Sequence, residues 1–375
     1  MTIYWILLAF CVFLFPICKF IANRIKKVPD FNKVENREIK VYFILVSLAL
    51  IFVIGCRGLF VGRDTLNYYY TYAKLQDVSG RAVLLSDATE KGYLLFNILG
   101  HRLHLGFAGF NILYALINIS VVSYMIYKKS EMPWLSYFIY ICFEFFILDL
   151  TMMRQTLAMS VVALAITLDK NETVWDFLKF VLCIFIAQTI HQSAIIALPL
   201  WFLKKLPMDN YIIFIFLFFI GIAYLMRDSV AVLMGNTAEM ISERYAKYGE
   251  LEEGTAGMRL YLMVLVTVGL GMFLRRYRQI EGNSWPFYSL CIMLMLLPAL
   301  QGGGVAMRSY YYYYLFIIIY VPNLVAALDP KKDLFIKILI VSLYLIVGVY
   351  FLNSSLGENS LAGETYKFFW QPMFD

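Results

Sequence analysis

Long apolar runs alternate with short polar stretches from one end of the chain to the other. An α-helix crosses the hydrocarbon core of a bilayer with ~20 apolar residues, and many of the runs approach that length. The pattern predicts an all-α polytopic membrane protein with about twelve transmembrane helices. The predicted spans are 3–22, 41–56, 107–127, 134–150, 152–168, 177–190, 193–203, 210–226, 258–274, 286–301, 310–328 and 334–352. For residues 92–105 we predict a re-entrant or interfacial helix outside the bilayer.

The basic residues indicate how these helices are oriented. Cytoplasmic loops of membrane proteins are enriched in lysine and arginine, and such clusters fall in alternate loops of this chain. The clusters are Arg24, Lys26 and Lys27; Lys128 and Lys129; Lys170; Lys204 and Lys205; Arg275, Arg276 and Arg278; and Lys331 and Lys332. We place these loops in the cytoplasm and both termini outside. The segments 57–106 and 227–257 are then extracytoplasmic loops, in which we expect partial helical structure.

Composition supports a single transmembrane domain over residues 1–375. Hydrophobic residues make up 61% of the chain and charged residues 15%, which excludes a water-soluble core. The first apolar run lacks a basic segment before it and a cleavage site after it, so it predicts a retained helix. The 6 cysteines lack CxxC spacing, and His101 and His104 lack nearby carboxylates. We therefore expect no metal site and no cofactor, and a net charge of +6 does not imply nucleic-acid binding.

Lysine and arginine are distributed differently on this predicted topology. Most lysines lie in cytoplasmic loops or at cytoplasmic helix ends, whereas most arginines lie outside. The outer arginines are Arg57, Arg63, Arg81, Arg102, Arg154, Arg227, Arg244, Arg259 and Arg308. A guanidinium group stays charged and matches phosphate with several N–H donors. This asymmetry predicts an anionic substrate on the outer face.

The loop after the second predicted helix combines glycines, charges and tyrosines. Arg57 and Arg63 supply two guanidinium groups, Asp64 can take a proton or orient an arginine, and Tyr68 offers a stacking face. The glycines between them permit a tight backbone. The loop is therefore a candidate binding site, and an amphipathic linker with a surface ion pair is the alternative.

Two more polar positions stand beside apolar sequence. Glu90 precedes the helix predicted outside the bilayer and is either a proton acceptor or a solvated helix start. Arg154 and Gln155 lie where two apolar runs meet with almost no polar loop between them. We expect them to face a water-filled cavity or to pair with Asp149 or Glu144, and a purely structural pair is the alternative.

The later part of the chain adds a histidine and a glycine-rich turn. His191 lies between two short apolar runs, where its imidazole can orient or deprotonate a substrate hydroxyl, or can simply pack. Three glycines and Arg308 form a turn whose amides suit a phosphate. Five tyrosines, Tyr310 to Tyr314, follow this turn. An aromatic belt at the membrane interface would explain the tyrosines, but not the glycines and the arginine.

In their order, these motifs resemble the EpsG family of membrane proteins, which is grouped with the Wzy-type polymerases of O-antigen and exopolysaccharide synthesis. The motifs are RG-x-x-VG-x-DT-x-x-Y, E-x-GY, RQ-x-x-A, H-x-SA and R-x-YYYY, from Arg57 to Tyr314. The resemblance implies a GT-C-like architecture with an outward-facing cavity in the bacterial cytoplasmic (inner) membrane. It also implies an enzyme that polymerises undecaprenyl-diphosphate-linked oligosaccharide units into a surface polysaccharide on the periplasmic or extracellular face.

The resemblance and the motifs together assign three groups of residues. The expected ligands of the substrate diphosphate are Arg57, Arg63, Arg154, Gln155 and Arg308. The candidate catalytic residues, among which the sequence gives no order, are Asp64, Glu90 and His191. The expected sugar contacts are Tyr68, Tyr93, Tyr310 and Tyr311.

Two other activities remain open from the sequence. An O-antigen ligase, or another glycosyltransferase that uses a lipid diphosphate, shares the donor and differs in the acceptor. A flippase for lipid-linked oligosaccharide also needs a basic cavity, but the chain has no clear internal repeat. Alternating charges predict a lid helix in 227–257, with a surface loop as the alternative. A chain-length regulator protein is a further partner that the resemblance allows.

Overall fold

The computed structural model confirms the all-α fold class. It describes residues 2–26, 37–168, 173–227, 229, 255–280, 282–300, 309–356 and 365–372, which form helices and connecting segments. Within these ranges the extended pairing is an isolated antiparallel bridge between Arg57 and Phe368. Arg308 and most of the predicted lid in 227–257 lie outside the described residues.

Several helices are long and apolar enough to cross a bilayer. These are Thr2–Ile21 of α1 (Thr2–Lys26), α6 (Phe107–Lys129) and α20 (Leu334–Ser355). The pair α7 (Pro133–Cys142) and α8 (Phe145–Thr151) passes the same test together, with a bend of 50° between its halves. Shorter apolar helices occupy most of the other predicted spans. The chain is therefore a membrane-embedded protein, and the number of about twelve spans stays a prediction.

The helices divide into two compact units. The first unit comprises residues 1–167, 186–192 and 339–375, and the second comprises residues 168–185 and 193–338. Besides α1, α6, α7, α8 and α20, the helices mainly in the first unit are α2 (Arg37–Gly55), α3 (Thr65–Lys74), α4 (Gly80–Leu85), α5 (Lys91–Arg102) and α9 (Met153–Leu168). The last turn of α10 (Val174–Ile190) also belongs to it.

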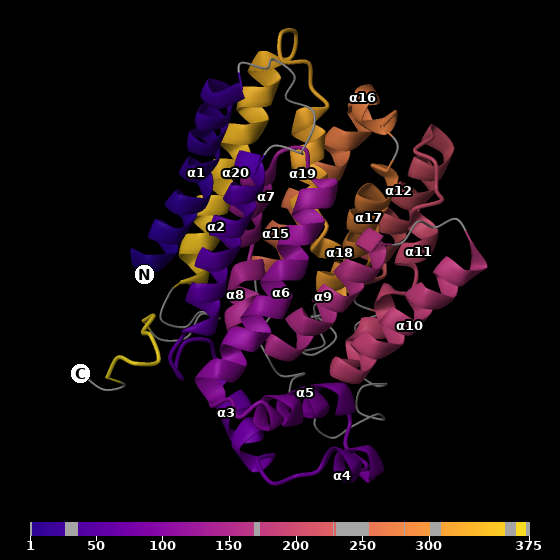
Figure 1. Ribbon diagram of the computed structural model, residues 1–375. Coiled ribbons are helices and arrows are strands. Elements are labelled where there is room, and N and C mark those ends of the chain that lie inside the picture. The colour runs from indigo at the N-terminus through magenta and orange to yellow at the C-terminus, as the bar shows by residue number, and fades with distance from the viewer. Residues whose placement is uncertain are drawn as a thin grey trace. The chain divides into compact units, whose positions relative to one another are not determined.

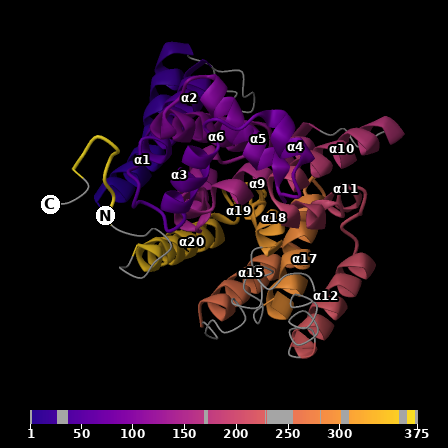
Figure 2. The ribbon, with the colours of Figure 1, turned by 90° about the horizontal axis from the view of Figure 1, so that it is seen from below.

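In the first unit, α1, α2 and α6 lie side by side (Figures 1 and 2). Two interhelical hydrogen bonds fix their register. The Tyr42 hydroxyl on α2 donates to the Cys11 carbonyl on α1 at 3.0 Å, and Ser47 on α2 donates to Ser123 on α6 at 2.7 Å. Both bonds satisfy polar groups among apolar side chains, where an unpaired polar group is costly.

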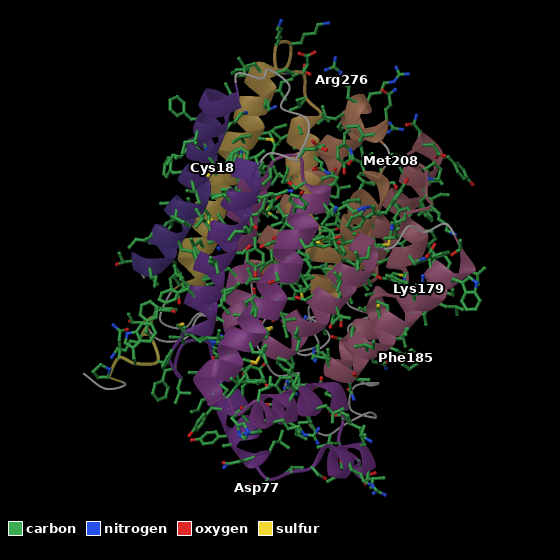
Figure 3. All side chains as sticks on the ribbon, viewed as in Figure 1. Cys18, Asp77, Lys179, Phe185, Met208 and Arg276 are labelled. Carbon is green, nitrogen blue, oxygen red and sulfur yellow. The ribbon has the colours of Figure 1, made fainter. Side chains whose placement is uncertain are left out.

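The short helices α3, α4 and α5 lie together at one end of this unit (Figure 1). Figure 3 marks that end with Asp77, whereas Cys18 on α1 lies toward the opposite end. The C-terminal segment 365–372 packs near the start of α1, where the rings of Tyr4 and Tyr366 are 5.7 Å apart. Residues from distant parts of the sequence therefore meet beside α3–α5.

The second unit is organised around α17 (Ser284–Leu300). This helix packs against α11 (Leu200–Leu203), α12 (Asn210–Leu225), α15 (Thr255–Phe273), α18 (Tyr311–Tyr314) and α19 (Ile317–Ala326). The 3-10 helix η1 (Gln192–Ala197) and α16 (Arg275–Arg278) complete the described helices of this part. The Tyr313 hydroxyl donates to the Ile196 carbonyl at 2.5 Å. The tyrosine run is therefore part of the buried core of the second unit.

Gly92 allows the start of α5 to approach the end of α10 closely. A Cβ at this position would overlap Thr189 Oγ1 and lie 2.9 Å from the Thr189 carbonyl carbon. We expect Gly92→Ala to lower the melting temperature in detergent by several degrees, because overpacking costs about 1–3 kcal/mol. Gly221→Ala in α12 is the control, since nothing lies within 4 Å of its Cβ position. Equal melting temperatures for the two variants would contradict the close packing.

Candidate functional site

The Glu90 carboxylate contacts the side chains of Arg154 and His191 at the α3–α5 end of the first unit. Its Oε2 lies 2.5 Å from Arg154 Nη1, at the start of α9. Its Oε1 lies 2.6 Å from His191 Nδ1, directly after α10, and 3.3 Å from the backbone nitrogen of Gln192. Both carboxylate oxygens are therefore engaged, and three segments distant in sequence converge on one side chain.

The backbone at Glu90 holds the carboxylate in this place. Glu90 is the N-cap of α5 and has φ 56°, in the left-handed region that residues other than glycine rarely adopt. Such strained positions persist where the surrounding structure over-determines them, and they cluster at functional sites. The close contact of Gly92 with Thr189 brings the α5 start against the end of α10. The glutamate and the glycine of the E-x-GY motif are therefore both explained by the local structure at the start of α5.

Arg154 lies between aromatic rings and remains partly accessible. Its Cζ is 5.8 Å from the ring centroids of both Tyr68 and Tyr93, and these two rings are 5.9 Å apart in an edge-on arrangement. The rings are buried, whereas 40% of the Arg154 side chain is exposed. A guanidinium in this setting keeps its charge and offers N–H groups to an anion.

His191 is held by one ring nitrogen only. Its Nδ1 faces the Glu90 carboxylate, whereas Nε2 is buried and has no hydrogen-bond partner among the described residues. A carboxylate beside Nδ1 favours a proton on that nitrogen, which leaves Nε2 of a neutral imidazole as an acceptor. The geometry is that of a base oriented by a carboxylate.

The pKa of Glu90 lies below its usual value. Burial acts to raise it, but the hydrogen bond from His191 and the positive charge of Arg154 outweigh the burial. Glu90 therefore stays ionised at neutral pH. Its role in this arrangement is that of an acceptor and orienting group for its two neighbours.

The R-G-x-x-V-G-x-D-T motif forms a tight turn packed on α8. Gly62 has φ 85°, and a Cβ there would overlap the Leu150 carbonyl oxygen, so only glycine fits. Thr65 Oγ1 donates to the Val61 carbonyl at 2.6 Å and lies 3.2 Å from the Leu150 carbonyl. The glycine and threonine of the motif thus serve the turn itself.

Arg57 is buried, with 1% of its surface exposed. Its Nη1 donates to the Ile54 carbonyl at 2.7 Å, its Nε lies 3.5 Å from Thr65 Oγ1, and its Cζ is 5.9 Å from the Tyr114 ring. Arg63 is exposed, and Asp64 is partly exposed as the N-cap of α3 without a side-chain capping bond. The three charged residues of the loop are therefore in different environments.

Asp149 is a buried polar centre that the sequence did not identify as a site. Its carboxylate accepts hydrogen bonds from Asn118 Nδ2 at 2.6 Å, from the Tyr114 hydroxyl at 3.3 Å and from the Tyr140 hydroxyl. Asp149 was one of several partners that the sequence left open for Arg154, and the structure pairs Arg154 with Glu90. An ionisable residue within an apolar run is itself a signal of such a centre.

The remaining predicted residues are apart from this cluster or outside the described ranges. Gln155 follows Arg154 in α9 and is buried. Tyr310 and Tyr311 are buried in the second unit, where their rings stack at 4.3 Å. Arg308 is outside the described residues. Glu90, His191, Arg154, Tyr68 and Tyr93 are the predicted residues that the first unit brings together.

An all-helical chain with apolar spans, and with a charged and aromatic cluster at one end of its helices, is a polytopic membrane protein with a polar site. A family model described as "EpsG family" matches residues 40–366. The chain belongs to the EpsG family, a family of Wzy-like polymerases. No curated protein and no solved structure matches this chain significantly.

The depressed pKa of Glu90 predicts how its contribution to stability depends on pH. An unfolded glutamate has a pKa of ~4.3, so the contribution is complete above that value and is lost as the pH falls through the lower folded pKa. We expect the melting-temperature difference between the unmodified protein and Glu90→Gln to be larger at about pH 5 than at about pH 3. A difference that grows toward pH 3 would contradict the depressed pKa.

The Asp149 centre predicts a stability effect of its own. In Asp149→Asn an amide N–H₂ replaces an oxygen that accepts hydrogen bonds, which leaves buried donors facing each other. We expect a loss of about 1–3 kcal/mol, seen as a lower melting temperature. Asp77→Asn is the control, because Asp77 is exposed at the α3–α5 end (Figure 3). If both variants melt like the unmodified protein, Asp149 does not organise the core.

Proposed function

We propose that this protein polymerises undecaprenyl-diphosphate-linked oligosaccharide repeat units into a surface polysaccharide at the outer face of the bacterial cytoplasmic membrane. It is then a glycosyltransferase that transfers the growing chain from its lipid carrier to the next repeat unit. The observation that carries the proposal is the cluster of Glu90, His191 and Arg154 beside two tyrosine rings. Membership of a family of Wzy-like polymerases supports it.

Arg154 is suited to the diphosphate leaving group. As the glycosidic bond breaks, negative charge gathers on the diphosphate, and a preorganised guanidinium lowers the barrier by stabilising that charge. The side chain is 40% exposed, so part of the guanidinium can exchange water for phosphate oxygens. Arg63, Gln155 and Arg308 stay proposed as further contacts to the diphosphate of one or both lipid carriers.

His191 is suited to act as the general base. Glu90 fixes the proton on Nδ1, and Nε2 is then the acceptor for the proton of the attacking sugar hydroxyl. That oxygen forms the new bond to the anomeric carbon while the bond from this carbon to the diphosphate oxygen breaks. Glu90 is a positioning residue in this scheme, and Asp64 is the alternative base.

Tyr68 and Tyr93 border the same reaction centre. Their rings flank Arg154, and aromatic faces are the common contact surface for the C–H groups of sugars. We assign them to the sugar on the donor side. Tyr310 and Tyr311 stay proposed as further sugar contacts.

The decisive experiment uses purified protein in detergent with a synthetic undecaprenyl-diphosphate repeat unit, without nucleotide and without added metal. A ladder of products that differ by one repeat establishes polymerisation. Transfer of a single unit to a lipid acceptor without a ladder indicates a ligase. Movement of the intact lipid-linked unit across a vesicle bilayer, with no product formed, indicates a flippase.

Variants in the same assay test the assigned roles. We expect His191→Ala to slow the ladder about 100-fold or more, because a general base contributes about 10²–10⁴-fold to a rate. Arg154→Lys keeps a charge but loses the planar set of donors, and we expect a slower ladder from it as well. Arg81→Gln is the control, an exposed arginine of α4 in the same segment. Unchanged ladders in both site variants would remove these assignments.

A further inference from the structure

A pocket lies beside the 57–65 turn, apart from the contacts of Glu90. Its walls come from residues 57–61, from the start of α6 and from the C-terminal segment 365–372. Its volume is about 210 Å³. Pockets for drug-sized ligands have about 300–1,000 Å³, so this one suits a smaller group such as a single sugar ring.

The C-terminal wall of the pocket is fixed by backbone hydrogen bonds. The Gly58 nitrogen donates to the Lys367 carbonyl at 2.8 Å, and the Phe369 nitrogen donates to the Cys56 carbonyl at 3.0 Å. The Tyr366 hydroxyl donates to the Val53 carbonyl at 2.6 Å. A preformed wall lowers the entropic cost of binding a ligand.

Two buried polar atoms of residues that line this pocket lack partners. Arg57 and Asn111 are each 1% exposed, and both line the pocket. Among the described residues, Arg57 Nη2 and Asn111 Oδ1 have no hydrogen-bond partner. Buried polar groups are nearly always satisfied, so a donor and an acceptor without partners on two residues that line one pocket point to a ligand.

The pair of open groups selects the chemistry of that ligand. A hydroxyl group can accept from the Arg57 N–H and donate its own hydrogen to Asn111 Oδ1. A phosphate oxygen that carries no hydrogen satisfies the arginine but is repelled by the amide oxygen. The combination therefore fits a neutral polyol better than a diphosphate.

The rest of the lining is aromatic and adjoins the reaction centre. Phe107, Phe368 and Tyr69 contribute rings to the pocket. Tyr69 follows Tyr68 directly in α3, and the Tyr68 ring flanks Arg154. The same short helix therefore serves the pocket and the proposed active site.

We propose that this pocket is a saccharide subsite that holds one sugar ring by a hydroxyl placed between Arg57 and Asn111. The identity of the saccharide rests on the proposed function, whereas the site itself does not. Arg57 then recognises sugar, and the lipid diphosphate is bound elsewhere.

The test is a direct binding measurement on the full-length protein in detergent, by calorimetry. The probes are the lipid-free single repeat unit, released from the surface polysaccharide of the source strain, and inorganic pyrophosphate. Asn111→Leu removes the amide oxygen at nearly constant size. Phe369→Ala removes a half-exposed ring of the pocket, and Trp370→Ala is its control, because the neighbouring Trp370 is similarly exposed, at 55% against 48%, and does not line the pocket.

We expect Asn111→Leu and Phe369→Ala to weaken binding of the repeat unit about tenfold, the effect of losing one buried hydrogen bond or ring contact. We expect Trp370→Ala to leave it unchanged. Absence of saccharide binding, equal binding by all variants, or pyrophosphate binding that Phe369→Ala weakens would overturn the proposal.

The ladder assay separates the two hypotheses. A ladder with unaltered KM in the pocket variants removes the subsite alone, whereas variant-sensitive saccharide binding without any ladder removes the polymerase alone.

Discussion

The candidate site depends on the two oxygens of a single carboxylate. Glu90 places Arg154 and His191 on opposite oxygens of one group, although they lie 64 and 101 residues away in sequence. Removing the carboxylate would leave a partly buried guanidinium and a partly buried imidazole facing each other, and an unpaired charge in such a setting is costly. The same contact that holds α5, α9 and the end of α10 together therefore also orients the proposed base and the proposed diphosphate ligand.

Tyr114 connects two buried polar side chains, those of Asp149 and Arg57. The Tyr114 hydroxyl lies 3.3 Å from Asp149 Oδ1 and 2.5 Å from Thr156 Oγ1. The centroid of its ring lies 5.9 Å from Arg57 Cζ. Because Thr156 directly follows Arg154 and Gln155 of the RQ motif in α9, the network connects the 57–65 turn with the helix that carries Arg154. Hydrogen bonds of this kind inside a helical bundle make its arrangement specific, since each partner has few alternatives.

The sequence predicted where helices form and which residue types gather, but not their partners. Apolar runs located the helices because their periodicity is local. Of the alternatives that the sequence left open for Arg154, pairing with Asp149 is not the one observed, because Met152 ends α8 and α9 begins at Met153, so that the two side chains leave different helices. Glu90 is aimed at its partners by a left-handed backbone angle, which no pattern of residue types encodes. The burial of Arg57 likewise depends on its bridge to Phe368, 311 residues later.

Burial also separates arginines that the predicted topology had grouped together. Arg154 is partly exposed and Arg63 is exposed, so either can give up water and accept a phosphate at little structural cost. Arg57 already donates to a backbone carbonyl and lies within a packed turn, and its Nη2 amino group has no partner among the described residues. A dianion brought to that position would be repelled by the Asn111 oxygen, whereas a hydroxyl would not. In the proposed scheme one residue type then has two roles: exposed guanidinium groups bind the charged lipid carrier, and the buried guanidinium of Arg57 binds a hydroxyl group of the sugar.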